Sequence, residues 1–430
     1  MIPFDKLEIL NPKRESEIQT GRASWYPYYA GFSEKFAHKL ILSAKMQIES
    51  QVSDPWNGSG TTTAAAAGIG HNAFGCDLNP VMVLAARARM LSKREKKSLV
   101  PLGAIILKHA AKADHVEEDP LANWFQTGAA GNLRSIERSI QQVLVNENQR
   151  YNICTAEHVQ HVSDLAAFFY VALFRTTRSL LSRYDATNPT WIKSPVKANS
   201  KLRTSLQELH SVFRIHVSEM AQAIDGDNLT KDSEVKISVG SSASVPLPDK
   251  SVDMVLSSPP YCTRIDYAVA TKAELAVLGY RIDIEFDDLR RQLIGTSTVP
   301  RVAPISNIAW GRTCTEFLGE VESHRSKASS GYYLKNHLQY FDSIYTSLGE
   351  ISRTLKKEAA CILVVQDSFY KDVHNDLPKI IVEMSESQNM ALRRQVPFLH
   401  QRTMAGVNPG VRKYRAEVSA TESVLCFSKN

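Results

Sequence analysis

The sequence lacks the features of several specialised protein classes. Its six cysteines are scattered, with no Cys-x-x-Cys pair, and so predict neither a zinc site nor a disulfide framework. The longest apolar stretches, such as residues 165–174, are well short of the roughly 20 residues that span a bilayer. The N-terminal segment lacks the cationic start and apolar run of a signal peptide. We therefore expect a soluble, cytoplasmic protein with reduced thiols and no membrane contact.

The distribution of charge is the first feature that indicates a function. The chain has 430 residues and a formal net charge of +6, which permits a polyanionic partner without requiring one. Residues 171–216 contain eight basic and two acidic side chains, and residues 387–416 contain six basic and no acidic ones. Two local basic tracts are typical of contact surfaces for a polyanion, although solvated basic faces give the same pattern.

The first ninety residues alternate between strand and helix patterns. A short strand at residues 47–52 runs into a glycine-containing loop at 54–62, and an Ala-rich run at 63–68 is a good helix former. A second short strand at residues 72–77 ends in an acid. Strands that alternate with helices predict an α/β fold, with a doubly wound, Rossmann-like sheet of mostly parallel strands.

The chain is predicted to divide into one catalytic domain and its insertions. Residues 1–91 and 236–430 form the two parts of the catalytic domain, and residues 92–235, whose apolar spacing is helical, form a large helical insertion. A second insertion, residues 279–331, is expected to be irregular. The other predicted elements are helices at 34–45, 80–91 and 333–355, and strands at 235–239, 251–257, 360–365 and 421–427.

The glycine loop and the acid that follows it suit a cofactor with an adenosine tail. Gly58 and Gly60 let the backbone approach a ligand closely because they lack a Cβ. Asp77 lies 17 residues beyond Gly60, near the spacing at which a carboxylate takes ribose hydroxyls. Asp54, beside the loop, is placed to meet the amino or sulfonium end of such a cofactor. The spacing is not Gly-x-Gly-x-x-Gly, which counts against NAD.

The tetrapeptide Ser258-Pro259-Pro260-Tyr261 follows directly after a predicted strand, where sites open in this architecture. Its two prolines remove two backbone donors and hold the chain extended. The exocyclic amine of a base is a poor nucleophile, and hydrogen bonds to the Ser258 hydroxyl and a proline carbonyl would free its lone pair. Tyr261 can stack on a base that is flipped out of the helix. The alternative is a proline-terminated strand with a packing tyrosine.

With these motifs the sequence resembles the DNA amino-methyltransferases, which modify N4 of cytosine or N6 of adenine. The matching segments are residues 26–33, 54–61, Asp77, 258–261 and 420–429. The resemblance implies S-adenosyl-L-methionine as the cofactor and double-stranded DNA as the partner, with no metal. The cofactor-binding residues that it implies are Tyr29, Phe32, Asp54, Pro55, Gly58, Ser59, Gly60, Thr61, Asp77 and Ser241, and the catalytic residues are Ser258, Pro259, Pro260 and Tyr261.

The order of the motifs and the first residue of the tetrapeptide narrow the resemblance. The cofactor motifs precede the catalytic motif, as in unpermuted members. Serine in first position favours N4 of cytosine, so we expect site-specific DNA methylation in a restriction-modification or defence system with a cognate endonuclease. Adenine N6, an RNA target and a non-catalytic nucleic-acid-binding relict of the fold are the alternatives. The relict is supported by one departure, Gly240-Ser241, where the family often has Gly-Asp.

Two regions are candidates for DNA recognition. In the helical insertion, Arg175, Arg178 and Lys193 are expected to contact DNA, the alternative being a helix bundle that only supports the fold. Arg264, just beyond Tyr261, and Arg402, in the C-terminal basic tract, are further candidates. Residues 279–331 offer four arginines to phosphates or guanine edges, namely Arg290, Arg291, Arg301 and Arg312.

Overall fold

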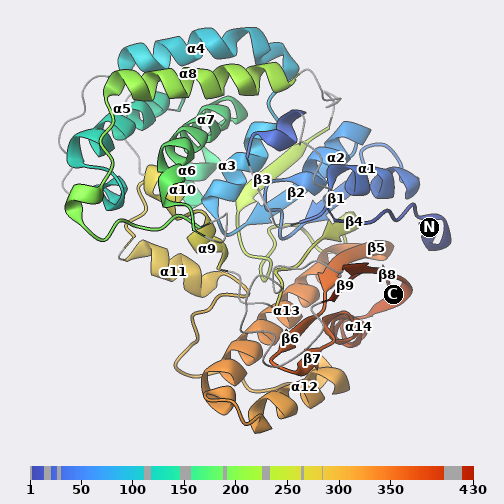
Figure 1. Ribbon diagram of the computed structural model, residues 1–430. Coiled ribbons are helices and arrows are strands. Elements are labelled where there is room, and N and C mark those ends of the chain that lie inside the picture. The colour runs from blue at the N-terminus through green and yellow to red at the C-terminus, as the bar shows by residue number, and fades with distance from the viewer. Residues whose placement is uncertain are drawn as a thin grey trace.

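The computed structural model has a seven-stranded sheet at its centre, with the strand order β3-β2-β1-β4-β5-β9-β8 (Figure 1). The structure describes residues 2–13, 21–26, 31–110, 118–145, 156–186, 191–224, 233–262, 266–282, 284–400 and 419–430. Neighbouring strands from β3 to β5 are parallel, whereas β9 runs antiparallel to both β5 and β8. The predicted doubly wound α/β fold with a mostly parallel sheet is confirmed.

The two faces of β5 (Leu355–Gln366) show why the middle strands are apolar throughout. Ala360, Ile362 and Val364 enter the core on one face, and Cys361, Leu363 and Val365 enter the core on the other. A strand that is covered on both faces needs a continuous apolar run. The other strands of the sheet are β1 (Gln51–Asp54), β2 (Asn72–Asp77), β3 (Val235–Val239), β4 (Val252–Ser257), β8 (Met390–His400) and β9 (Ala420–Lys429), and β6 (Ser368–Tyr370) pairs with β7 (Val373–Asn375) in a separate hairpin.

Helices cover both faces of this sheet. On one face lie α1 (Glu34–Ser43) and α2 (Thr61–Ile69), and α3 (Pro80–Arg89) packs beside α2 against β2 and β3. The other face is covered by α13 (Leu334–Thr354) and α14 (Leu377–Ser387). The layers leave the carboxyl ends of the parallel strands open to a site.

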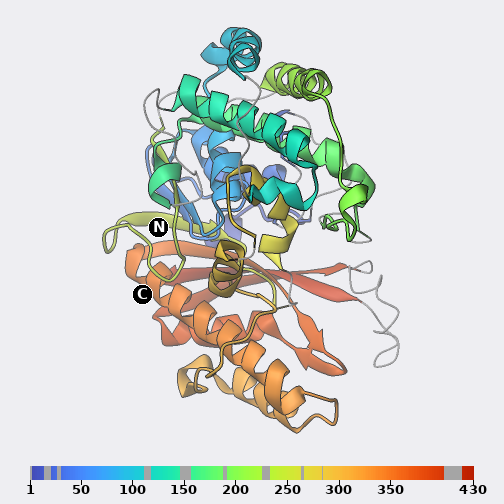
Figure 2. The same cartoon turned by 90° about the vertical axis from the view of Figure 1, so that its left-hand side faces the viewer.

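A helical lobe is built onto α3, and Figures 1 and 2 show it above the sheet. Its helices are α4 (Lys96–His109), α5 (Thr127–Leu144), α6 (Ala156–Gln160), α7 (Asp164–Leu181) and α8 (Leu206–Ala223). Their apolar side chains join those of α3 in one core, and α7 is buried along most of its length. The central helix of the predicted insertion therefore packs on α3, which in turn covers β2 and β3 of the sheet.

The second predicted insertion is not irregular. After α9 (Tyr267–Ala270) and α10 (Lys272–Val277), it contains α11 (Glu285–Gln292) and α12 (Arg312–Ser323). The buried residues of α12 follow the spacing of one helical face, and they are Cys314, Phe317, Leu318 and Val321. The prediction was wrong here because each helix is short and flanked by Gly, Pro and Ser. No helix in the described stretches is long and apolar enough to cross a membrane.

Candidate active site

The candidate site lies at the carboxyl ends of β1 and β4, which are neighbours in the sheet. The chain leaves β1 through α2 towards β2, and it leaves β4 towards β5 on the opposite side. Such a reversal of strand order is the place where open α/β sheets bind ligands. The glycine loop follows β1 and the Ser-Pro-Pro-Tyr turn follows β4. The fold therefore brings together two motifs that lie some two hundred residues apart in the chain.

Asp54 ties these two strand ends together. Its Oδ1 accepts hydrogen bonds from the Ser257 hydroxyl at 2.5 Å and the Trp56 N–H at 3.1 Å, and its Oδ2 accepts one from the Thr62 hydroxyl at 2.7 Å. Burial raises the pKa of Asp54 to about 6, against the opposing effect of these hydrogen bonds. The side chain is 3% exposed, so its described contacts are structural and its contact with a cofactor stays a prediction.

The glycine loop has a conformation that depends on its glycines. Gly58 has φ +48° and Gly60 has φ +82°, both in the left-handed region. A Cβ on Gly60 would lie 2.7 Å from the Cβ of Ala86 in α3, so the loop also needs a small residue for packing. The remaining predicted loop residues are tied to the scaffold: the Pro55 carbonyl accepts from the Cys76 thiol, the Ser59 carbonyl accepts from Arg89 Nη1 at 2.8 Å, and Thr61 opens α2.

Asp77 holds the other side of the loop. At the end of β2, its Oδ2 accepts from the Gly58 N–H at 3.0 Å and its Oδ1 accepts from the Asn79 N–H at 2.8 Å. Burial raises the pKa of Asp77 to about 6, and the two backbone donors oppose this shift. The Gly240 N–H donates to the Asp77 carbonyl at 3.1 Å, which places the neighbouring Ser241 at the same edge of the sheet. The Ser241 hydroxyl accepts from the Ala243 N–H at 3.2 Å.

The N-terminal cofactor motif is only partly described. Tyr29 lies outside the described residues. Phe32 is 4% exposed, and its ring centroid lies 5.2 Å from that of Phe36 in the core beneath α1. Its contact with the cofactor stays a prediction.

The Ser-Pro-Pro-Tyr turn presents oxygen acceptors. The Ser258 hydroxyl donates its hydrogen to the Val364 carbonyl at 3.0 Å, which leaves its lone pairs as acceptors. The Pro260 carbonyl accepts from the Tyr340 hydroxyl at 2.8 Å. Among the described residues, the Pro259 carbonyl accepts no hydrogen bond. Ser258 and Pro259 therefore offer two acceptors to a ligand with two hydrogens to donate.

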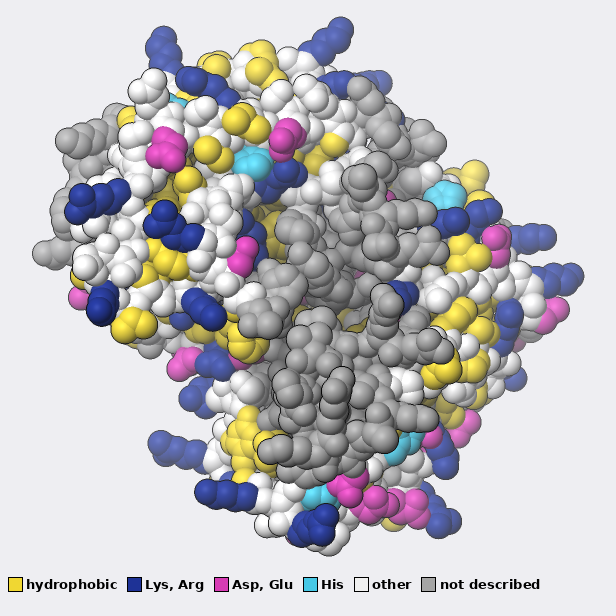
Figure 3. Space-filling view, viewed as in Figure 1, with side chains coloured by type: hydrophobic (Ala, Val, Ile, Leu, Met, Phe, Trp, Pro, Cys, Tyr) yellow, Lys and Arg dark blue, Asp and Glu magenta, His cyan; other side chains and the backbone are white. Residues whose placement is uncertain are grey.

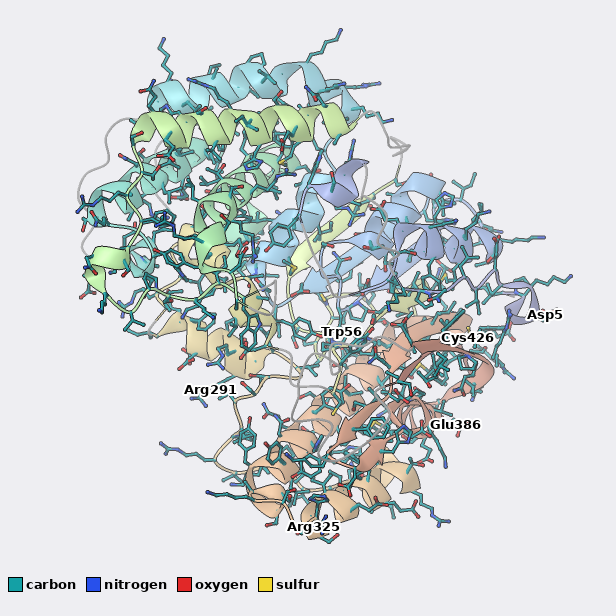
Figure 4. All side chains as sticks on the ribbon, in the orientation of Figure 1. Asp5, Trp56, Arg291, Arg325, Glu386 and Cys426 are labelled. Atoms are coloured by element: carbon teal, nitrogen blue, oxygen red, sulfur yellow. The ribbon has the colours of Figure 1, made fainter. Side chains whose placement is uncertain are left out.

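Tyr261 is fixed by a residue that sequence reasoning missed. Its hydroxyl donates to the Glu422 carboxylate on β9 at 2.8 Å, and burial followed by the charge of Glu422 raises the pKa of this phenol well above its usual range. A Cβ on Gly295, which has φ +80°, would lie 3.1 Å from the Tyr261 carbonyl. Glu422 lies within the matching segment 420–429, but nothing in that segment marks it as a partner of Tyr261, and Tyr340 stands in no recognised motif. Figure 4 shows Trp56, from the cofactor loop, in the centre of the molecule where these elements meet.

The candidate DNA-contacting arginines of α7 are engaged within the protein. Arg175 donates to Glu219 at 2.8 Å and to His216 at 3.3 Å, both on α8. Arg178 pairs with Glu274, a carboxylate that is fully buried and also accepts from the Tyr26 hydroxyl at 3.1 Å. A DNA contact by either arginine would require these pairs to break.

The other predicted DNA contacts are less constrained by the structure. The Lys193 side chain is exposed, and its contact with DNA stays a prediction. Arg264 and Arg402 lie outside the described residues. On the face seen in Figure 3, the coloured Lys and Arg side chains are spread over both lobes and form no single patch among the described residues.

The structural role of Arg178 gives a first testable expectation. Arg178→Ala should destabilise the protein by about 3–5 kcal/mol, because it leaves the Glu274 carboxylate buried without its cation. Arg183→Ala, which removes an exposed arginine two residues beyond α7, should change the free energy of unfolding by no more than about 0.5 kcal/mol. Urea unfolding followed by circular dichroism measures both. If the two variants unfold at the same urea concentration, Arg178 has no structural role and is again a candidate for contact with DNA.

Comparison with known proteins found two curated proteins and a solved structure that are similar to this chain. No protein-family model matches the chain. The chain is 20% identical over 421 residues to the type II methyltransferase M.MvaI of Kocuria varians, a match that covers 91% of this chain and 87% of that protein. It is 22% identical over 291 residues to the type II methyltransferase M.BsoBI of Geobacillus stearothermophilus, covering 60% of this chain and 52% of that protein.

A solved structure, described as a SAM-dependent methyltransferase from Methanosarcina mazei, is also similar to this chain. It shares 9% sequence identity and a TM-score of 0.30, and the match covers 90% of this chain and 96% of that one. The two sequence relatives support the prediction of a methyltransferase, while the base and the recognition site are matters for proposal.

Proposed function

We propose that this chain is an S-adenosylmethionine-dependent DNA methyltransferase that transfers a methyl group to N4 of cytosine in a flipped-out base. The observation that carries the proposal is the pair of acceptors on Ser258 and Pro259, held at the carboxyl end of β4 beside the glycine loop. The likeness to two type II methyltransferases supports the reaction class.

The turn is suited to activating an amine. The Ser258 hydroxyl, whose hydrogen is directed at Val364, accepts one hydrogen of the base amine, and the Pro259 carbonyl accepts the other. Both bonds draw the nitrogen towards tetrahedral geometry and localise its lone pair. Tyr340 and Glu422 hold the turn at the Pro260 carbonyl and the Tyr261 hydroxyl, so the two acceptors are fixed before the base arrives. The Tyr261 ring stacks on the flipped base.

The residues around the glycine loop fit S-adenosylmethionine. A carboxylate has about four lone-pair positions, and the described backbone donors use two of those on Asp77, which leaves acceptors for the two ribose hydroxyls. Ser241, at the same edge, is a hydroxyl partner for the adenine. When bound, the cofactor supplies an electrophilic methyl group on a sulfonium. Transfer of this methyl group to the amine nitrogen would break its bond to sulfur and release one proton from the nitrogen to solvent.

Ionisation of Asp77 should make cofactor affinity pH-dependent. Its pKa of about 6 lies above the ordinary 3.8, so the carboxylate accepts ribose hydroxyls fully only above about pH 6. The affinity for S-adenosylmethionine should therefore fall as the pH decreases through 6. The affinity is measured by calorimetric titration between about pH 5 and 7. In this range the α-amino group of the cofactor stays charged, so its own ionisation does not contribute to the change.

Asp54 also has a pKa of about 6, so a variant is needed to show which of the two carboxylates causes the pH dependence. Asp77→Asn should bind more weakly at pH 7 and with a flatter pH dependence. A pH dependence in Asp77→Asn equal to that of the wild type would assign the titration to another group.

The decisive experiment is mass spectrometry of nucleosides from DNA incubated with the protein and S-adenosylmethionine, with Ser258→Ala as the control. We expect N4-methylcytosine that disappears in the control. Detection of N6-methyladenine would be consistent with the proposed mechanism, but it would show that the target base is adenine and not cytosine. If varied genomic DNA gains no methylated nucleoside from the wild type, the proposal fails for DNA, and RNA becomes the substrate to test.

The biological setting that we propose is the modification half of a restriction-modification or defence system, with duplex DNA and a cognate endonuclease as partners. Both sequence relatives are type II methyltransferases, which supports this setting. Protection of methylated DNA from cleavage by the endonuclease of the source organism would test it.

A further inference from the structure

Residues 21–26, which lead into the N-terminal cofactor motif, are held by the helical lobe. The Trp25 ring is 1% exposed and meets the Phe168 ring of α7 edge to face, with the centroids 5.2 Å apart. The Ser24 carbonyl accepts a hydrogen bond from Arg175 Nη1, also on α7, at 3.3 Å. Because both contacts come from one helix, α7 fixes the path of the chain as it enters the motif.

This segment ends on a fully buried carboxylate. Glu274, on α10, accepts a hydrogen bond from the Tyr26 hydroxyl at 3.1 Å and is paired with Arg178 of α7. Arg178 also donates to the Ala270 carbonyl at the end of α9. A carboxylate buried to this extent needs its partners, so Tyr26, Glu274 and Arg178 form a fixed triad. Three parts of the chain meet there: the helical lobe, the stretch after the catalytic turn and the start of the N-terminal cofactor motif.

Residues 21–26 are also connected to the glycine loop. Arg22, which is 2% exposed, donates from Nη1 to the Arg89 carbonyl at the end of α3, at 2.5 Å. Arg89 in turn donates from Nη1 to the Ser59 carbonyl at 2.8 Å. A shift of residues 21–26 would therefore disturb the loop that is predicted to hold the cofactor.

The stretch after the catalytic turn is connected to the predicted ribose acid. Thr271, the residue before α10, accepts a hydrogen bond from Asn79 Nδ2 at 2.8 Å. The Asn79 N–H donates to the Asp77 carboxylate, also at 2.8 Å. Two connections therefore run from the triad to the cofactor residues, one to the glycine loop and one to Asp77.

We propose that Tyr26 is a positioning residue for the cofactor: its hydrogen bond to Glu274 fixes residues 21–26 against the helical lobe and thereby sets the affinity for S-adenosylmethionine. Without this bond, residues 21–26 would adopt several arrangements in the free protein, and only one of them would suit the bound cofactor. The apparent affinity of a ligand falls by the fraction of molecules in the competent arrangement. The inference rests on the proposed function for the place of the cofactor beside the glycine loop and Asp77.

The test is Tyr26→Phe, with Tyr170→Phe as the matched control. Tyr170, on α7, is fully buried, and its hydroxyl donates to Glu137 of α5 at 2.9 Å. Glu137 is itself paired with Arg134. The control therefore removes the same bond, from a phenol to a buried and paired carboxylate, but between two helices of the lobe. The affinity for S-adenosylmethionine is measured by calorimetry at neutral pH, and stability is measured by urea unfolding.

The positioning role predicts a different result for each tyrosine. Both variants should unfold at a lower urea concentration than the wild type, because each loses a buried hydrogen bond. Tyr26→Phe should bind S-adenosylmethionine about 5-fold more weakly, whereas Tyr170→Phe should bind it as the wild type does. In methylation assays, the KM of Tyr26→Phe for S-adenosylmethionine should rise by the same factor, and its kcat should be unchanged.

Three outcomes would overturn the positioning role. They are a Tyr26→Phe protein with the cofactor affinity of the wild type, an equal loss of affinity in Tyr170→Phe, and a fall in kcat at unchanged KM. Calorimetry needs no DNA, so the two variants still decide the role of Tyr26 if the wild type binds S-adenosylmethionine but methylates no DNA. That result would remove the proposed DNA target alone, whereas a wild type that binds no S-adenosylmethionine would overturn both proposals.

Discussion

Replacing Tyr261 by alanine should lower kcat/KM for methyl transfer by about 5- to 150-fold, because stacking of a base on an aromatic ring contributes about 1–3 kcal/mol. The ring also carries the hydroxyl that binds Glu422, so the alanine variant loses the stacking surface and the bond that orients it. Tyr261→Phe keeps the ring and loses only the hydroxyl. We expect the Tyr261→Phe variant to lose about 1 kcal/mol of transition-state stabilisation, which lowers kcat/KM about fivefold.

The comparison of the two variants separates stacking from positioning. Steady-state methylation of one duplex with saturating S-adenosylmethionine measures both, and calorimetry should show that neither changes cofactor affinity. If Tyr261→Ala is as active as the wild type, the ring packs the turn and does not touch the base. If Tyr261→Phe is as damaged as Tyr261→Ala, the Glu422 hydrogen bond is the dominant contribution and stacking is secondary.

Gly60→Ala should be the most disruptive single-methyl change in the cofactor loop. A side chain at φ +82° costs about 1–2 kcal/mol, and a Cβ at 2.7 Å from that of Ala86 adds an overpacking cost of about 1–3 kcal/mol. The free energy of unfolding should therefore fall by about 2–5 kcal/mol. Affinity for S-adenosylmethionine should fall as well, since the loop must move to relieve the contact.

The matched control is Gly319→Ala, in the middle of α12, where an added Cβ meets nothing within 4 Å. This substitution should stabilise the protein by about 0.5–1 kcal/mol, because alanine favours a helix over glycine. Urea midpoints and calorimetric titration decide between the outcomes. A Gly60→Ala protein with wild-type stability and cofactor affinity would show that the loop adapts and that its positive φ is not required.

The sequence predicted those elements whose pattern is complete within a few residues. β2 was predicted at its observed bounds, and β4 differed by one residue at its start. Both are short apolar runs that end at a chemical motif, so the same residues mark the strand and the site. The order of the motifs likewise placed the glycine loop and the tetrapeptide at strand ends.

Other elements depend on contacts between distant residues and could not be predicted. β8 lies at the edge of the sheet, where Arg393, Gln395 and Pro397 face solvent, so its alternating pattern looks like an exposed basic segment. The bonds of Tyr340 and Glu422 to the catalytic turn join residues 80 and 161 positions apart. The role of Arg178 changed for the same reason, because its partner Glu274 lies 96 residues further along the chain.

The antiparallel end of the sheet imposes an order on synthesis. β9 lies between β5 and β8 although it follows both in the chain. Until residues 420–429 leave the ribosome, β5 has an open edge of apolar residues and β8 has no neighbour in the sheet. At about 5–20 residues per second, the roughly 60 residues after β5 take on the order of 3–12 s to make. During that interval the nascent chain exposes an unpaired strand edge, which can pair with other chains and aggregate. The yield of soluble protein on overexpression should therefore depend on growth temperature and on the supply of chaperones.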